Sequence, residues 1–109
     1  MEKEHTIRAV VFKNANAWVA QCLEYDIATQ AASIDALLYE LERIVVAHLI
    51  VADKEGLSDP FADIPKAPLR FWEMYRRAQS TLRTMPELPA SSKQVPPQVE
   101  VAFPDAVAA

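Results

Sequence analysis

A single glycine, Gly56, occurs among the 109 residues, whereas proline occurs eight times. Glycine supplies the positive φ angles of phosphate-binding loops and of the tightest hairpin turns. The sequence therefore excludes glycine-rich nucleotide-binding loops and hairpins built on glycine. Five of the prolines fall in the last 24 residues, and each one removes a backbone donor and restricts the residue before it. We therefore expect residues 86–97 to be a proline-rich connector to a C-terminal strand.

The length and composition predict one domain over residues 1–109. Apolar residues make up 51% of the chain and charged residues 24%, which is enough apolar surface for a core. The longest apolar run, Ile44–Ala52, is far shorter than the roughly 20 residues of a membrane-spanning helix. Met1–Thr6 is charged and does not resemble a signal peptide, and one cysteine excludes a disulfide framework. We expect a cytoplasmic protein that does not bind membranes.

Three segments before residue 32 have the composition of strands. They are Thr6–Lys13, Ala17–Leu23 and Asp26–Ala31, and the second of them alternates small or apolar residues on one face. Asn14 and Asn16 flank the first turn, where asparagine is the best replacement for glycine at positive φ. Short connections between the segments predict an antiparallel meander.

A long amphipathic helix is predicted for Ser33–Asp53. Its apolar residues recur at i, i+3, i+4 and i+7, and they are Ile34, Leu37, Leu38, Leu41, Val45, His48 and Leu49. Ser33 is a good N-cap, and Gly56 suits the left-handed position that ends a helix.

A second helix is predicted for Pro68–Met85, and Gln98–Phe103 alternates like a last strand. The predicted order is β-β-β-α-α-β. We expect an α+β domain of two layers, in which a curved antiparallel sheet packs on one long helix.

Residues with catalytic or metal-binding chemistry are few. Cys22 shares its predicted face with Trp18 and Ala20, which indicates a core residue. His48 lies on the apolar stripe of the long helix, where a core or interface histidine is the simpler interpretation. Glu24 and Asp26, with Asp35, resemble the carboxylates of a metal-dependent nuclease, but their places beside a turn and at a helix start are by far the better explanation. We assign no catalytic, cofactor or metal residue.

The charges are unevenly distributed. Residues 21–63 contain nine carboxylates against Arg43 and Lys54, whereas residues 69–83 contain four arginines against Glu73. The two regions either pair with each other within the chain or form separate surfaces. In the second case Glu24, Asp26 and Glu40 are candidates for contacting a basic protein. Four arginines on one helix are too few to predict nucleic-acid binding.

Self-association is predicted from apolar residues beyond those that one sheet can cover. The candidate interface residues of the second helix are Phe71, Trp72 and Tyr75, with Met74 beside them and with Arg76 and Arg77 at the rim. The end of the first helix adds Ile44, Val46, Ile50 and Val51. A homodimer is the simplest assembly, because symmetric dimers are the commonest. The alternative is that the second helix covers the first within one chain.

The stretch Trp18–Gln30, followed by Ser33–Leu37, resembles the HicB-like family, and Ala20–Gln30 is its most specific part. The resemblance extends over roughly residues 6–52. It implies a partial RNase H-like fold and a non-enzymatic antitoxin that binds a small basic RNA-cleaving toxin. Ala31 and Ala32 stand where the family usually has glycine, and no second recognition helix follows.

Two functions therefore remain open. The first is a protein-binding module that binds a small basic partner through an acidic surface. The second is a stand-alone oligomeric protein of this fold that acts as an adaptor or binds a small ligand, with no toxin partner.

Overall fold

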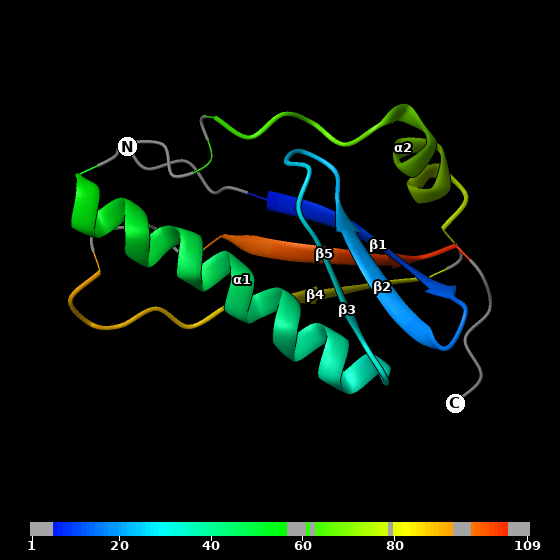
Figure 1. Ribbon diagram of the computed structural model, residues 1–109, viewed down its shortest axis with the longest axis horizontal. Helices are drawn as coiled ribbons and strands as arrows, with labels where there is room; N and C mark the ends of the chain where they lie inside the picture. The colour runs from blue at the N-terminus through cyan, green and yellow to red at the C-terminus, as the bar shows by residue number, and fades with distance from the viewer. Residues whose placement is uncertain (1–5, 57–60, 62, 79, 93–96, 105–109) are drawn as a thin grey trace.

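The computed structural model describes residues 6–56, 61, 63–78, 80–92 and 97–104. Along these residues the elements are β1 (Thr6–Asn14), β2 (Ala17–Cys22), β3 (Ala28–Ala31), α1 (Ile34–Glu55), α2 (Leu69–Arg76), β4 (Ser80–Thr84) and β5 (Gln98–Phe103). The fold class is α+β, as the sequence predicts (Figure 1). His5 and residues 93–96 of the predicted connector lie outside the described residues.

The strands form one mixed sheet in the order β3-β2-β1-β5-β4. β1 pairs with β2, β2 with β3 and β4 with β5, all antiparallel. The expectation of a wholly antiparallel sheet is wrong, because β5 pairs parallel to β1, with Thr6 beside Gln98. The last strand in the sequence therefore lies inside the sheet, between β1 and β4.

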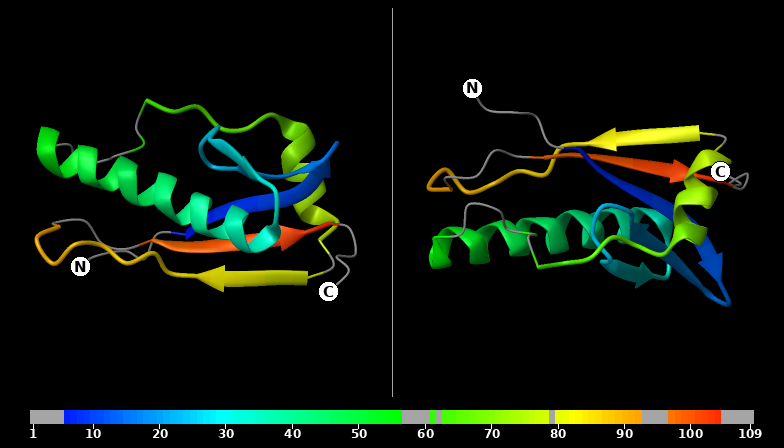
Figure 2. Two further views of the ribbon diagram at one scale, coloured as in Figure 1. Left: turned by 60° about the horizontal axis from the view of Figure 1, so that its bottom comes forward. Right: turned by 90° about the horizontal axis from the view of Figure 1, so that it is seen from above.

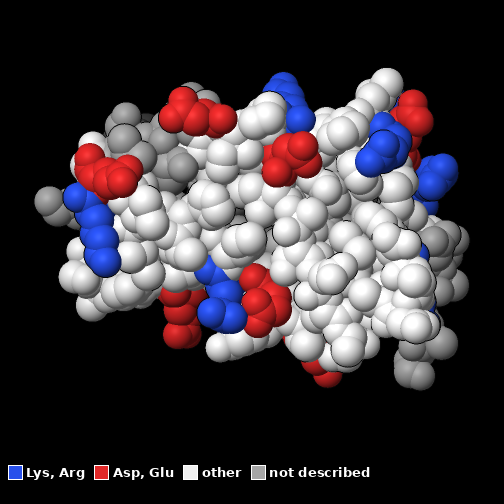
Figure 3. Space-filling view, viewed as in Figure 1, with Lys and Arg blue, Asp and Glu red and all other residues white. Residues whose placement is uncertain are grey.

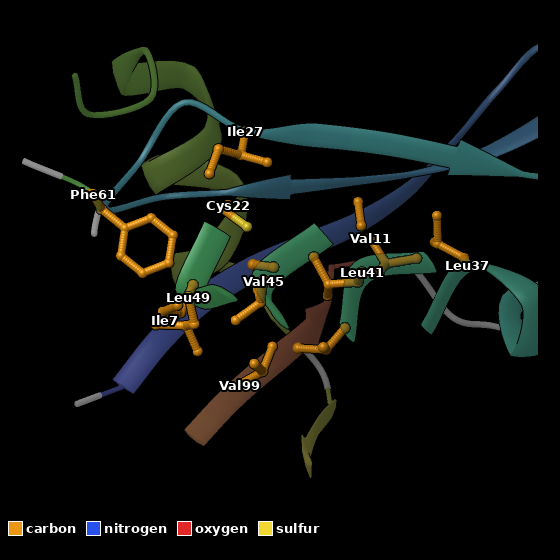
Figure 4. Packing of buried hydrophobic residues seen from close by; sticks show 13 residues of the cluster. Ile7, Val11, Cys22, Ile27, Leu37, Leu41, Val45, Leu49, Phe61 and Val99 are labelled. Atoms are coloured by element: carbon orange, nitrogen blue, oxygen red, sulfur yellow. The ribbon is translucent and has the colours of Figure 1, made fainter. Parts of the chain in front are cut away.

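The long helix is confirmed. The Ser33 hydroxyl accepts a hydrogen bond from the Ala36 N–H at 3.2 Å, and Gly56 ends the helix in the left-handed conformation at φ 69°. Within α1 the residues Leu37, Leu41, Val45 and Leu49 are buried. Figure 4 shows them pointing towards β1 and β5, where they meet Ile7, Val11 and Val99. This packing is the main core of the protein.

The sheet also has a second covered face. The residues of β1 alternate, so that Val10 is buried on the side opposite to Ile7, Ala9 and Val11. There α2 packs through Phe71 against Val10 and its neighbours. The expectation of only two layers is therefore incomplete, because α1 and α2 cover opposite faces of the sheet.

The second helix is shorter than predicted. It runs from Leu69 to Arg76 and not from Pro68 to Met85. Ser80–Thr84, predicted as the last turns of that helix, forms β4 and pairs with β5, with Leu82 beside Val101. The observed order is therefore β-β-β-α-α-β-β. Threonine, which occurs twice in this segment, favours strands over helices, and a strand partner was available in β5.

The β1–β2 hairpin turns through Ala15 and Asn16, and Ala15 has φ 56°. We predicted asparagine for a positive φ, but among the described non-glycine residues only Ala15 has one. The chain thus places a Cβ atom where glycine or asparagine is usually found.

Candidate protein-binding surfaces

A groove of about 570 Å³ lies between one flank of α1 and the end of β4, and we call it the α1–β4 groove. Its lining on α1 is Tyr39, Glu42, Arg43, Val46, Ala47 and Ile50, and its opposite wall is Thr84, Met85, Pro86 and Glu87. The α1 residues recur at helical spacing, so they form one continuous flank beside the buried stripe.

Two hydroxyl groups, at Thr84 and Ser92, form hydrogen bonds that hold the segment between them against α1. The Thr84 hydroxyl donates a hydrogen bond to Glu42, and the Ser92 hydroxyl donates one to Asp53 at 2.7 Å. Between these bonds Pro86 is fully buried and Leu88 packs against the main core. Residues 85–92 therefore form a strap along α1, and the groove is built into the fold at the start of that strap.

The groove combines apolar side chains with a partly acidic rim. Tyr39 is 63% exposed and Met85 is 55% exposed. Glu42 and Glu87 lie in the lining, and neighbouring Glu40 accepts a hydrogen bond at 3.0 Å from Arg43. The carboxylates thus outnumber the one guanidinium. In Figure 3 the area over β3 and the first turns of α1 is largely uncharged.

On the other face of the sheet, Arg8 is the centre of a polar and aromatic cluster. Its main-chain N–H and its Nε both donate to the Glu24 carboxylate, at 2.7 and 2.5 Å. Its guanidinium lies 4.9 Å from the Trp72 ring centre and 5.6 Å from that of Tyr75. Arg8 therefore joins β1 to α2 and to the end of β2.

The same cluster continues to β5 and β4. The Tyr75 hydroxyl donates to Glu100, and the Arg83 Nε donates to the second oxygen of Glu100 at 3.1 Å. Burial, followed by the hydrogen bond to Glu100, raises the pKa of Tyr75 to about 12. The hydrogen bond from Tyr75 is the main reason why the pKa of Glu100 is lowered. These groups hold α2 on the sheet.

Several predicted partner-binding residues make contacts within the chain instead. Glu24, Trp72 and Tyr75 meet around Arg8, and Phe71 is buried and stacks on Phe12 with ring centres 5.9 Å apart. The aromatic group of α2 is thus largely used to cover its own sheet. The alternative that α2 covers α1 is also wrong, because the sheet separates the two helices.

The remaining predicted residues do not share one surface. Asp26 is exposed in the β2–β3 connection and accepts a hydrogen bond from the Gln21 amide at 2.8 Å. Glu40 lies on α1 beside the groove. Arg76 and Arg77 are exposed at the end of α2, on the opposite side of the sheet. Of the predicted residues, only Glu40 adjoins the α1–β4 groove.

Cys22 is a core residue, as the sequence predicts, whereas His48 is half-buried at the edge of the main core. Burial raises the pKa of the Cys22 thiol to about 12, which disfavours the thiolate that a nucleophile requires. The His48 Nδ1 lies 2.8 Å from the Ile44 carbonyl oxygen, and its ring stacks on Phe61. Among the described residues no group of three or more histidine, cysteine, aspartate or glutamate side chains is placed to hold a metal ion.

Sequence reasoning missed half of the groove. Val46 and Ile50 were expected to be apolar residues of the first helix that the sheet does not cover. They line the groove. Thr84 and Met85 were expected in a helix, so their wall was not anticipated. A smaller hollow of about 320 Å³ on α2 is lined by Lys66, Ala67, Leu69, Trp72 and Arg76.

The comparisons with known proteins add no assignment. Models of protein families, curated proteins and solved structures were compared with the chain, and none matched. No helix in the described part of the chain is both long and apolar enough to cross a membrane.

Proposed function

We propose that this chain is a non-enzymatic protein-binding module that binds a small basic partner protein in the α1–β4 groove. The observation that carries the proposal is the combination of exposed Tyr39 and Met85 with the carboxylates of Glu42 and Glu87 in one pre-formed groove. Aromatic residues and methionine are enriched in interface cores. Carboxylates at the rim favour a partner of positive charge and increase its rate of association.

The resemblance of residues 6–52 to HicB-like antitoxins supports the same proposal. It suggests that the partner is a small RNA-cleaving toxin, whose basic surface would contact the acidic rim. The acidic site differs from the one expected from the sequence, because Glu24 is engaged with Arg8 and only Glu40 lies near the groove. A short, basic open reading frame beside the gene would support this form of the proposal.

The proposal is tested by comparing groove variants with a matched surface variant. The tagged chain is used to capture proteins from its source organism, and each captured basic protein is then purified and titrated by calorimetry. We expect the double variant Tyr39→Ala and Met85→Ala to weaken binding by about tenfold or more, since truncated interface anchors commonly cost over 1 kcal/mol. Leu69→Ala removes an equally exposed side chain on α2 and should leave binding unchanged.

Charge is tested separately with Glu87→Lys in the groove and Glu73→Lys on α2 as its control. Only the first variant should slow association with a basic partner, and the difference should shrink in high salt. Equal affinities for the wild type and the groove variants would contradict the proposed site.

A stand-alone adaptor or small-ligand protein is the second candidate function. It is favoured by the groove volume of about 570 Å³, which lies in the range of small-molecule sites. A metabolite screen by thermal shift distinguishes it. A ligand that raises the melting temperature of the wild type but not of the Tyr39→Ala and Met85→Ala variant would favour this function.

A further inference from the structure

The outer edge of β4 is free of any strand partner within the described part of the chain. β4 ends the sheet order, and its inner neighbour is β5 (Figure 2). Ser80, Thr81, Leu82 and Arg83 are all exposed. Alternate backbone N–H and C=O groups of such a strand point outwards and are ready to pair with another strand.

β4 has few of the features that protect an edge. Its sequence Ser80–Thr84 contains no proline and only one charge, Arg83. That charge is already paired with Glu100 in its own sheet, at 3.1 Å. Leu82 projects from the strand and is 44% exposed. Bare backbone groups and an exposed apolar side chain on one short strand favour pairing by strand addition.

The other edge strand, β3, is a weaker candidate. It has four residues, Ala28–Ala31, and carries no exposed large apolar side chain. It also lies beneath the start of α1, with which it is in contact. A partner strand at β3 would gain few side-chain contacts.

Two copies of β4 can pair antiparallel without placing like charges opposite each other. A two-fold axis perpendicular to the sheet, centred on Leu82, places Leu82 opposite its equivalent. It also pairs Thr81 with Arg83 and Ser80 with Thr84, so that Arg83 does not face its own equivalent. A register centred on Arg83 would place two guanidinium groups opposite each other, which is unfavourable.

We propose that β4 pairs with β4 of a second copy of this chain, centred on Leu82, and joins the two five-stranded sheets into one. The axis keeps the same face of both sheets on the same side, so both α1 helices and both α1–β4 grooves lie on one face of the dimer. This interface differs from the one predicted from α2, whose aromatic residues pack inside the chain. The inference does not depend on the proposed partner-binding function.

The test is the mass of the full chain in solution, measured by light scattering from micromolar to millimolar concentration. We expect twice the 12.2 kDa of one chain. Leu82→Lys places two ammonium groups opposite each other at the axis and should raise the dimer dissociation constant by about tenfold or more. The control Leu69→Lys alters an even more exposed leucine on α2 and should remain dimeric.

A cysteine variant that can form an intermolecular disulfide tests the same interface if Leu82→Lys unfolds. Directly opposite Cβ atoms in an antiparallel pair are about 4.5–5.5 Å apart, close to what a disulfide spans. Leu82→Cys should therefore form a covalent dimer on oxidation, whereas Leu69→Cys should not. The native Cys22 is buried and does not compete.

Three results would overturn the inference. The first is a wild-type mass of one chain at millimolar concentration. The second is a folded Leu82→Lys variant that dimerises as tightly as the wild type, which would place the interface elsewhere. The third is the failure of Leu82→Cys to cross-link under conditions in which the wild type is dimeric. None of these results depends on the groove variants, so the two proposals fail independently.

Discussion

The hydroxyl of Tyr75 on α2 donates a 2.5 Å hydrogen bond to Glu100 Oε1 on β5. It is the polar contact that links the short second helix to the strand placed between β1 and β4. Because α2 has only eight residues, its place on the sheet depends on tertiary contacts more than on its own helical stability.

Tyr75→Phe should lower the free energy of unfolding by about 1 kcal/mol at neutral pH, because the Glu100 carboxylate loses a donor. Denaturation in urea measures the change. Tyr39→Phe is the matched control, since Tyr39 is 63% exposed, and it should leave stability unchanged. Equal effects of the two substitutions would contradict the structural role of the Tyr75 hydroxyl.

The same pair predicts a pH dependence at both extremes. The pKa of Glu100 is lowered from 4.5 in the folded protein, so its contribution to stability is present above pH 4.5 and is lost as the pH falls through the folded-state value. The pKa of Tyr75 is raised from 10.0 to about 12, so its contribution is present below pH 10 and is lost as the pH rises towards 12. In Tyr75→Phe the alkaline component should disappear and the acid component should shrink. Unfolding curves measured across pH check both, and identical profiles for the variant and the wild type would contradict them.

Leu41→Asp should unfold the domain. Leu41 is fully buried in α1, at the centre of the main core, and an isolated buried carboxylate is very costly. Circular dichroism and thermal melting provide the measurement. Leu69→Asp, at a leucine that is 67% exposed, should melt like the wild type. A soluble Leu41→Asp protein with a cooperative transition would show that the core face is wrongly placed.

Truncation after Ala90 should abolish cooperative folding, because it removes β5. Val99 and Val101 are fully buried, and β5 bridges β1 and β4. Burying apolar side chains contributes about 1.5–3 kcal/mol each, so the loss is comparable to the whole stability of a small domain. Val101→Asp in the full chain should reproduce the effect, whereas Gln98→Asp, at a half-buried position, should cost less. An unchanged melting temperature after truncation would refute the role of β5.

Ala15→Gly should stabilise the protein by about 0.5 kcal/mol. Ala15 adopts φ 56° in the β1–β2 turn, where glycine avoids a steric cost of about 1–2 kcal/mol but loses more chain entropy on folding. Ala36→Gly, in the exposed first turns of α1, should have the opposite sign, with a cost of about 1 kcal/mol or less. Thermal melting of both variants provides the comparison, and destabilisation by Ala15→Gly would contradict the turn geometry.

The helix Ile34–Glu55 was predictable because its signals are local. Ser33, the apolar stripe and Gly56 mark its start, its buried face and its end within 24 residues of sequence. The core face of β2 was also predictable, since alternation within a strand shows which residues point together. These elements require no knowledge of distant parts of the chain.

The strand conformation of Ser80–Thr84 was not predictable from local signals. Four of its five residues are exposed and only Leu82 is apolar, so no alternation marks it as a strand. Leu82 instead extends the apparent helical pattern of Leu69 and Trp72. Its strand state comes from hydrogen bonds to β5, which is separated from it by a connector of 13 residues. For the same reason the wall of the groove formed by Thr84 and Met85 could not be anticipated.

The place of β5 between β1 and β4 has a consequence for biosynthesis. A ribosome makes β1 first and β5 last, and Thr6 pairs with Gln98 across nearly the whole chain. Until residues 98–103 emerge, the inner edge of β1 has no partner and the apolar residues that β5 covers remain in water. Non-local pairing of this kind slows folding and prolongs the exposure of unpaired strand edges. The nascent chain is therefore exposed to aggregation until β5 has emerged.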